Sequence, residues 1–403
     1  MRDKQTLVLI VNAGSSSVKL TVWSLTPKFE EVASGSIEKI GQGKPELTFA
    51  GKTEDISKVE VMNHAQAANL LYKKVAGTLE QQDISVVAHR IVSGGEELTK
   101  TTELTKDVIQ KIESLSALHP LHIGAELGLV DAFSKILPKA KQLACFDTAF
   151  SSSLPTVAKL LPIPRKYYEK GVRRYGFHGL AYQEVLVGLR KYYGGKVPAK
   201  IIAAHLGNGV SLAAILNGNP IDTTMSFTPA SGIPMSSRSG DLDPGILMYL
   251  QRLEGFTPEA LSKLINEESG LLGMSELSSD MKVLLEQEDE DQKAHEAVDV
   301  FCYQVKKTIG AYAAALGGVD AIVFSGGMGE NAPKIRARVC QGLEYLGVKL
   351  GEHLNKNGEK LISDVDSGVD VFVLRVDEAV TMAEEARTYL NNGGDNESKK
   401  QTA

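Results

Sequence analysis

The chain has 403 residues, more than one hydrophobic core usually holds, so we expect two domains. With 43% hydrophobic and 23% charged residues it has the balance of a globular protein, and its formal net charge of -6 argues against a general binder of nucleic acid or of anionic membranes. The three cysteines, Cys145, Cys302 and Cys340, lack the spacing of a disulfide scaffold or a cysteine-based zinc site. No signal peptide is visible and no stretch approaches the roughly 18 apolar residues of a membrane span, so we expect a cytoplasmic protein.

Strand-like and helix-like patterns alternate along the chain, which is typical of an α/β protein. The first half predicts strands at 6–11, 18–25, 84–88 and 142–146, with a polar glycine turn at 12–17. About 190 residues after the opening, the layout repeats as a strand at 200–205, a turn at 207–209 and a returning strand at 210–216. This repeat predicts a duplicated domain with a boundary near residue 150.

The rest of the chain continues the alternation. It predicts a helix at 298–316, a strand at 321–324, a glycine loop at 325–331, a basic helix at 333–339, a strand at 371–374 and a helix at 378–390. The acidic segment 286–296 is predicted to be a solvated helix face. We expect domains at 1–150 and 151–382, a C-terminal helix 383–391 that joins the first domain, and a disordered end at 392–403.

Residues that suit ligand binding follow the predicted strands, where α/β sheets collect their ligands. They are Asn12, His89, Arg90, Asp147, His205, Gly326, Gly327, Asp377 and Glu378. Three of these places are glycine loops, whose backbone N–H groups can approach phosphate oxygens closely. Together they indicate a nucleotide site.

The common nucleotide motifs are absent. Gly51–Thr53 ends like a P-loop, but Glu46 stands where the first glycine of that motif must be. Neither a dinucleotide fingerprint nor a protein-kinase catalytic loop is present. Phosphate-binding hairpins in two duplicated halves are instead the mark of the actin, sugar-kinase and heat-shock-chaperone ATPases. We therefore expect two α/β domains of that type with a cleft between them.

Two segments favour a functional interpretation of single residues. His178 lies among glycines in Arg173–Gly179, so a ligand or the backbone must satisfy its ring nitrogens. Arg238 lies among small residues in Met235–Pro244, which favours a guanidinium directed at an anion.

The chain resembles the acetate and propionate kinase family from Leu7 to about Arg387. The segments that carry the resemblance are Val11–Leu20, Arg173–Gly179, Ala204–Leu212, Arg238–Pro244 and Ser325–Asn331, in the order of the family. The resemblance implies reversible in-line transfer of the γ-phosphoryl group of ATP to acetate, giving acetyl phosphate and ADP. It also implies Mg²⁺, which Mn²⁺ can replace, and a homodimer formed through the C-terminal half.

The resemblance implies a role for each residue at the reacting groups. The implied catalytic residues are Arg90, His122, Asp147, His178 and Arg238, and the implied metal-placing residues are Asn12, Asp147 and Glu378. The two arginines would offset the repulsion between two anions, because an acetate ion needs no general base to become a nucleophile.

Binding roles are implied in the same way. The nucleotide would contact Asn12, Ser17, Lys19, His205, Gly207, Asn208, Gly209, Asp280, Met281, Lys282, Gly326, Gly327, Met328, Gly329 and Asn331. The acyl group would contact Arg90, Val92, Leu121, Phe177 and Pro229. Valine at position 92 leaves little room and favours acetate over propionate, by a margin that one methylene limits to about 1–3 kcal/mol.

Simpler roles stay open for some of these residues. Asp147 can cap a helix, Lys19 can face solvent, and we expect His89 and His205 to be structural, with bonds to the backbone. Phe177 and Val92 would be core residues in any fold.

The chain departs from the family at several positions. They are Ile123–Glu126, where the family usually has Asn-Pro and a further Asn, and Ser93, Lys282, Asp377 and Ala379. Two other functions remain as alternatives: a propionate or other short-chain acyl kinase, and a nucleotide-gated chaperone or filament-type ATPase.

Overall fold

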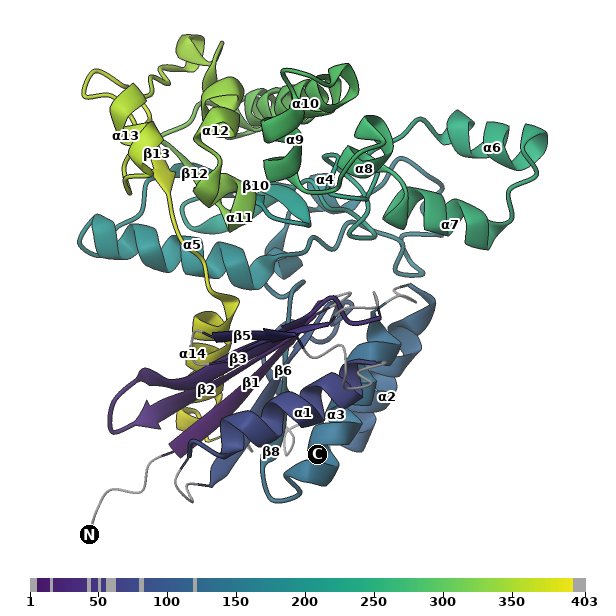
Figure 1. Cartoon of the computed structure of the whole chain (residues 1–403), viewed down its shortest axis with the longest axis vertical. Coiled ribbons are helices and arrows are strands. Elements are labelled where there is room, and N and C mark those ends of the chain that lie inside the picture. Colours follow the sequence, from purple (N-terminus) through teal and green to yellow (C-terminus); the bar gives the residue numbers. More distant parts are fainter. Residues whose placement is uncertain are drawn as a thin grey trace. The chain divides into compact units, whose positions relative to one another are not determined.

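The computed structural model describes residues 6–14, 17–41, 45–49, 52–55, 63–79, 83–118 and 122–393 (Figure 1). The chain divides into two compact units, unit 1 from residues 1–149 with 377–403 and unit 2 from residues 150–376. Each unit is built on one mixed sheet. Within the described ranges, none of the helices combines the length and apolarity that crossing a bilayer requires.

Unit 1 has an eight-stranded sheet in the order β5-β4-β3-β2-β1-β6-β8-β7. Its strands are β1 Thr6–Ala13, β2 Val18–Thr26, β3 Glu30–Glu38, β4 Glu46–Phe49, β5 Lys52–Asp55, β6 Ile84–Ile91, β7 Thr102–Glu103 and β8 Lys141–Phe146. Its helices are α1 His64–Ala76, α2 Lys106–Ser114, α3 Ile123–Ile136 and α14 Glu378–Asn391, with a 3-10 turn at Leu115–Ala117. Strand β1 pairs antiparallel with β2 and parallel with β6, and β6 pairs parallel with β8.

Strand β1 is central because its residues are apolar on both faces, as a strand covered on both sides requires. Leu7, Leu9 and Val11 pack into a cluster with buried residues of α1 and α3. Val8 and Ile10 point to the opposite face by the alternation of a strand, and α14 packs on β1 there (Figure 1). The last helix of the chain is thus part of the core of unit 1.

Unit 2 has a five-stranded sheet in the order β11-β10-β9-β12-β13. Its strands are β9 Lys200–Leu206, β10 Val210–Leu216, β11 Asn219–Thr223, β12 Ala321–Ser325 and β13 Asp370–Val373. Its helices are α4 Thr156–Lys159, α5 Gly179–Tyr192, α6 Pro244–Leu253, α7 Pro258–Glu267, α8 Gly270–Ser275, α9 Met281–Gln287, α10 Gln292–Leu316, α11 Gly326–Asn331, α12 Pro333–Cys340 and α13 Glu352–Asn357, with 3-10 turns at Phe150–Ser153 and Glu344–Leu346. Helix α5 packs its apolar face on β9 and β10, and α10 also packs on these strands.

The two sheets share one layout, which confirms the predicted repeat. In both β3-β2-β1-β6-β8 and β11-β10-β9-β12-β13, an antiparallel hairpin with a third antiparallel strand is followed by two parallel strands. The predicted strands and helices occur with shifts of a few residues at their ends; the largest shift is at α10, which begins six residues before the predicted start.

The predicted glycine loop at 325–331 is wrong, because Gly326–Asn331 is the short helix α11. Gly326 has a φ of +76°, and a Cβ there would lie 2.8 Å from the carbonyl of Leu206. Glycine at this position lets the chain turn directly from β12 into a helix while it touches the end of β9.

The predicted solvated helix face at 286–296 is only partly right, because most of its acidic side chains are exposed but the segment is not one helix and Glu288 is buried. Helix α9 ends at Gln287, and Asp291 caps the separate helix α10 by accepting hydrogen bonds from its first backbone N–H groups. Glu288 between them is buried and forms ion pairs of 2.7 Å with Arg338 and 3.4 Å with Lys334. The sequence did not reveal that Glu288 is buried, because its neighbours are acidic and its basic partners lie about 50 positions further along the chain. The predicted disordered end lies mostly outside the described residues, which stop at Gly393.

Candidate functional site

In unit 1, a network of polar side chains joins the ends of β1, β6 and β8 to the start of α14. Arg90 donates to both carboxylate oxygens of Asp147, from Nε to Oδ1 at 2.9 Å and from Nη2 to Oδ2 at 2.6 Å. Its Nη1 lies 2.9 Å from Oε2 of Glu378 and donates to Oδ1 of Asn12 at 3.1 Å. Asn12 closes the ring by donating from Nδ2 to Glu378 at 2.9 Å. The sequence predicted all four as site residues, and the structure brings them together.

Burial makes the members of this network depend on one another. Asp147 is 2% exposed, and the Arg90 side chain is 20% exposed. Burial alone would lower the pKa of Arg90, but the charges of Asp147 and Glu378 raise it above its ordinary value. Asp147 therefore binds Arg90 rather than merely capping a helix. Removing one partner of such a buried pair strongly destabilises the folded protein, because the other charge stays buried without its counter-ion.

Lys19 on β2 and Asp377 before α14 lie beside this network. Their side chains pair at 2.9 Å with about 40% of each exposed, so Lys19 does not simply face solvent. Asp377 also caps α14 by accepting a hydrogen bond from the Ala379 N–H. At this exposure the ion pair is expected to contribute only about 0–1 kcal/mol.

Glu126 is a buried residue of the site that the sequence did not identify. It lies in the first turn of α3 and is 8% exposed, and both of its carboxylate oxygens accept from the Val92 N–H, at 3.1 and 3.2 Å. Burial, together with the charge of Asp147, raises its pKa to about 8, although the Val92 hydrogen bond and Arg90 oppose the shift. The sequence did contain a sign of this residue: the chain departs from the family at Ile123–Glu126, and that departure introduces the Glu126 carboxylate.

His122 is the residue before α3, and its carbonyl accepts from the N–H of Glu126 at 3.1 Å. Leu121 lies outside the described residues. Val92 is 8% exposed, and in unit 2 Phe177 is 1% exposed, so both are buried as an apolar pocket or a core requires.

In unit 2, His178 precedes α5 with a left-handed backbone, at a φ of +59°. Its Nδ1 lies 2.9 Å from Oγ of Ser211 on β10, and the Ser211 hydroxyl also contacts the Tyr182 hydroxyl. Burial raises the pKa of Tyr182, so this phenol stays protonated and can act as a donor. The contacts fix the orientation of the imidazole and leave Nε2 on its far side.

The turn between β9 and β10 brings His178 and Arg238 together. A Cβ at Gly209 would lie 3.0 Å from Nε2 of His178 and 3.7 Å from Nη1 of Arg238. Arg238 also donates from Nη1 to the carbonyl of Pro229 at 3.2 Å. Two cationic or donor groups thus converge on a glycine turn, which is the arrangement that a phosphate group needs.

The rest of the turn is also held by the loop that carries Arg238. The Asn208 carbonyl accepts from the Ser236 N–H at 3.3 Å, and Gly207 donates its N–H to the Gly209 carbonyl at 3.0 Å. The predicted adenosine-side residues lie on α9 and α11. Asp280 caps α9 through the Lys282 N–H, Met281 is buried, and Asn331 donates to the Gly327 carbonyl at 3.0 Å.

Two other histidines have structural partners, as expected. His89 is buried with Nε2 2.8 Å from Oε1 of Gln142, and burial lowers its pKa to about 4, so it is neutral. His205 has Nδ1 3.2 Å from Oγ of Ser325, and its ring lies 4.7 Å from that of His178. Their partners here are side chains, whereas the sequence suggested backbone.

No group of three or more histidine, cysteine or acidic residues in the described ranges is placed to hold a metal ion. Asp147 and Glu378, the predicted metal-placing carboxylates, are instead bridged by Arg90. Each of the two residue sets is held by contacts within its own unit.

Comparison with known proteins identifies relatives over nearly the whole chain. The model of the acetokinase family matches residues 7–384. An acetate kinase of Bacteroides fragilis is 42% identical over 95% of this chain and 99% of its own length, and one of Coprothermobacter proteolyticus is 40% identical over 93% and 97%.

Solved structures agree with these matches. The crystal structure of Porphyromonas gingivalis acetate kinase has a TM-score of 0.85 at 37% identity and covers 96% of this chain and all of its own. A propionate kinase from Francisella tularensis has a TM-score of 0.87 at 30% identity and covers 94% and 98%. These neighbours confirm the predicted α/β fold, which the chain shares with acetate and propionate kinases.

Proposed function

The chain belongs to the acetokinase family, and we propose that it is an acetate kinase that transfers the γ-phosphoryl group of ATP reversibly to acetate. The products are acetyl phosphate and ADP. The observation that carries the proposal is the pair of residue sets, Arg90 with Asp147 and His178 with Arg238, on a chain whose curated relatives are acetate kinases.

The chemistry requires positive charge more than a base. Acetate is ionised at neutral pH, so its oxygen is already a nucleophile, and the barrier comes from the approach of two anions. Arg238 provides a guanidinium group beside the β9–β10 turn, where a phosphate group would bind, and Arg90 provides a second guanidinium group. Since Asp147 uses the bidentate edge of Arg90, Arg90 would meet the substrate through its remaining Nη2 N–H and its charge.

His178 would donate from Nε2 to an oxygen of the transferring phosphoryl group. In the proposed tautomer, Tyr182 donates to Ser211 and Ser211 donates to Nδ1 of His178, which puts the proton of the imidazole on Nε2. His122 is proposed as a second donor from unit 1. A preorganised donor of this kind typically contributes 10²–10³ in rate.

A magnesium ion fits the donor set of unit 1. Asp147, Glu378 and the amide oxygen of Asn12 are oxygen ligands of the kind Mg²⁺ prefers, and Mg²⁺ usually takes one or two carboxylates and completes its shell with water and phosphate. When bound, the ion would offset charge on the nucleotide phosphates; Mn²⁺ would substitute for it. The present contacts of both carboxylates with Arg90 imply that metal binding loosens the Arg90 pairs.

The nucleotide is proposed to bind mainly to unit 2. Its phosphates would lie along the β9–β10 turn at Gly207–Gly209, with His205 behind the turn, and on the first hairpin at Asn12, Ser17 and Lys19. The adenosine would lie between α9 and α11, in contact with Asp280, Met281, Lys282, Gly326, Gly327, Met328, Gly329 and Asn331.

The acyl pocket is proposed to consist of Val92, Leu121, Phe177 and Pro229 beside the two arginines. Pro229 already contacts Arg238 through its carbonyl. Valine at position 92 would favour acetate, and propionate would be a poorer substrate. We also propose that unit 1 and unit 2 are the functional domains, that unit 2 forms a homodimer, and that the enzyme acts in the cytoplasm.

Trapping of the acyl phosphate with hydroxylamine tests the proposal directly. With ATP and Mg²⁺, we expect acetate to give the highest rate, propionate a lower one and butyrate the lowest. A higher rate with propionate than with acetate at equal concentration would make the chain a propionate kinase. Steady ATP hydrolysis without any acyl phosphate would overturn the proposal.

A further inference from the structure

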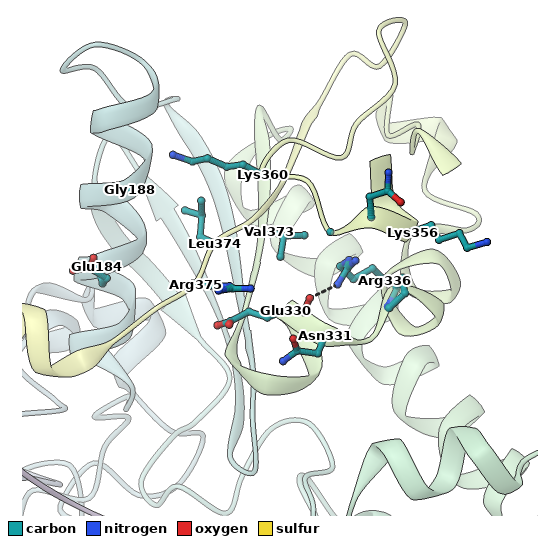
Figure 2. A pocket seen from close by; sticks show the side chains of 13 residues that line it. Glu184, Gly188, Glu330, Asn331, Arg336, Lys356, Lys360, Val373, Leu374 and Arg375 are labelled. Atoms are coloured by element: carbon teal, nitrogen blue, oxygen red, sulfur yellow. Dashed lines mark hydrogen bonds between the residues drawn. The ribbon is translucent and has the colours of Figure 1, made fainter. Parts of the chain in front are cut away.

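A cavity lies in unit 2, formed by α5, α11, α12, α13 and the end of β13 (Figure 2). Its volume is about 580 Å³, a size at which protein cavities hold small metabolites. Of the residues assigned above to substrate or nucleotide, only Asn331 lines it. We call it the α13 cavity.

The α13 cavity has a surplus of positive charge. Four basic side chains line it, Arg336, Lys356, Lys360 and Arg375, against two acidic ones, Glu184 and Glu330. The chain as a whole carries a net charge of -6, so this is a local reversal of sign. Such a cavity attracts anions more strongly than the rest of the protein surface does.

Arg336 is the deepest of these cations. It is 0% exposed and donates only to neutral oxygens: the side chain and carbonyl of Asn355, at 2.8 and 2.7 Å, and the carbonyls of Gly329 and Glu330, at 2.8 and 3.0 Å. No carboxylate pairs with it among the residues that the structure describes. A buried cation without a counter-charge favours an anion nearby.

Lys356, Lys360 and Arg375 are the exposed cations of the cavity. Lys360 holds its ammonium 5.4 Å from the centre of the Tyr192 ring, and Figure 2 shows Arg375 beside Glu330. Lys356 points away from the others in this view. Lys360 and Arg375 are therefore the residues that can close on a ligand, one as a point charge and one as a planar fork.

We propose that the α13 cavity binds a small polyanion, a metabolite that carries a phosphate group or several carboxylates, through Arg375 and Lys360 with Arg336 behind them. The inference goes beyond the proposed function, since neither acetate nor acetyl phosphate needs a second site.

Glu330 in the wall of the cavity connects it to the start of α11 and to the end of unit 2. Oε1 of Glu330 accepts from the Gly326 N–H at 3.0 Å and from the Val376 N–H at 3.4 Å. Gly326 begins α11, proposed above to contact adenosine, and Val376 is the last residue before the chain enters unit 1. An anion in the cavity would repel the Glu330 carboxylate and disturb both hydrogen bonds, so binding there should alter nucleotide binding.

Calorimetry on the full-length chain tests the site, with saturating Mg·ADP present to fill the nucleotide site. The probes are glucose 6-phosphate, tricarballylate and, as the uncharged control, glucose. We expect at least one anion to bind once per chain with a Kd below about 1 mM and glucose not to bind. Binding of only one anion identifies phosphate or carboxylate as the recognised group.

Variants locate the binding. Lys360→Ala and Arg375→Ala change exposed side chains, so both should fold, and each should weaken binding about tenfold. Lys307→Ala, an exposed lysine on α10 outside the cavity, should leave the Kd unchanged. If neither anion binds below about 1 mM, or if both cavity variants bind as tightly as the wild type, the proposal is wrong. The measurement needs no turnover, so its outcome is independent of the proposed activity.

Discussion

The two sheets of this chain have one topology and opposite chemistry at their strand ends. In unit 1, β6 ends at Arg90 and Ile91 and β8 is followed by Asp147, and these charges neutralise one another. In unit 2, β12, the counterpart of β6, is followed by Gly326, and the β9–β10 turn holds Gly209, so glycines stand at these places instead of a pair of charged side chains. Within each sheet, the fold determines which strand ends lie side by side, and the residues at those ends determine what they can bind.

This difference predicts different costs of substitution. A charge removed from unit 1 leaves a buried partner without its counter-ion, so stability and activity fall together. Arg238 in unit 2 donates to the carbonyl of Pro229 and lies beside the β9–β10 turn, where we propose that it meets the phosphoryl group, so its loss should affect turnover far more than stability.

Arg238→Ala should give the largest loss of activity, about 10³-fold or more in kcat, by analogy with other arginines that stabilise phosphoryl transfer. Hydroxylamine trapping measures the rate, and thermal unfolding should match the wild type. Arg252→Ala, on exposed α6, is the control.

Arg90→Ala should lose activity and also about 3–5 kcal/mol of stability in unit 1. Equal destabilisation by the two variants would contradict the comparison.

His178→Ala should lower kcat about 10²–10³-fold, the usual cost of losing one transition-state donor. Ser211→Ala should cost less, about tenfold, since it removes the partner that orients the ring and keeps Nε2 in place. The expected signature of Ser211→Ala is a fall in kcat with little change in the KM for ATP. A normal kcat in Ser211→Ala would show that the ring needs no such support.

Glu126→Gln should alter the pH dependence of stability. Because the folded pKa is raised from 4.5 to about 8, the unfolded chain releases this proton first, and Glu126 lowers stability progressively as pH rises from about 4.5 to 8. The amide of the variant can still accept from the Val92 N–H without ionising. Relative to the wild type, the variant should gain about 2 kcal/mol or more between pH 5 and pH 8.

The single tryptophan, Trp23 on β2, lies in unit 1 with Glu126 and reports the unfolding of that unit in urea. The matched control is Glu113→Gln on α2, an exposed carboxylate, which should show no such gain. An identical difference between Glu126→Gln and wild type at pH 5 and pH 8 would contradict the raised pKa.

Lys19→Ala should have the smallest effect of the series, below about 1 kcal/mol in unfolding free energy, because its ion pair with Asp377 is half exposed. Salt should reduce the effect further. The same urea titration measures it at low and high ionic strength. A loss above about 2 kcal/mol would mean that the pair matters more than its exposure allows.

The sequence predicted the strands and the repeat because apolar runs and glycine turns are local signals. It also singled out His178 and Arg238 from their small neighbours. It did not reveal that Asp147 takes the bidentate edge of Arg90, 57 positions away, or that Glu126 binds the Val92 amide. It mistook α11 for a loop, since glycines disfavour helices and only the contact with Leu206 explains Gly326. Pairings across the fold carry no local pattern.

The proposed function requires that residues of both units act on the same pair of substrates. Hydrogen exchange of the wild-type chain, with and without Mg·ADP plus acetate, tests it most directly through the amides at 90–93 and at 207–211. We expect exchange to slow in both segments when both ligands are present. Slowing in only one segment, with the other unchanged at saturation, would contradict it.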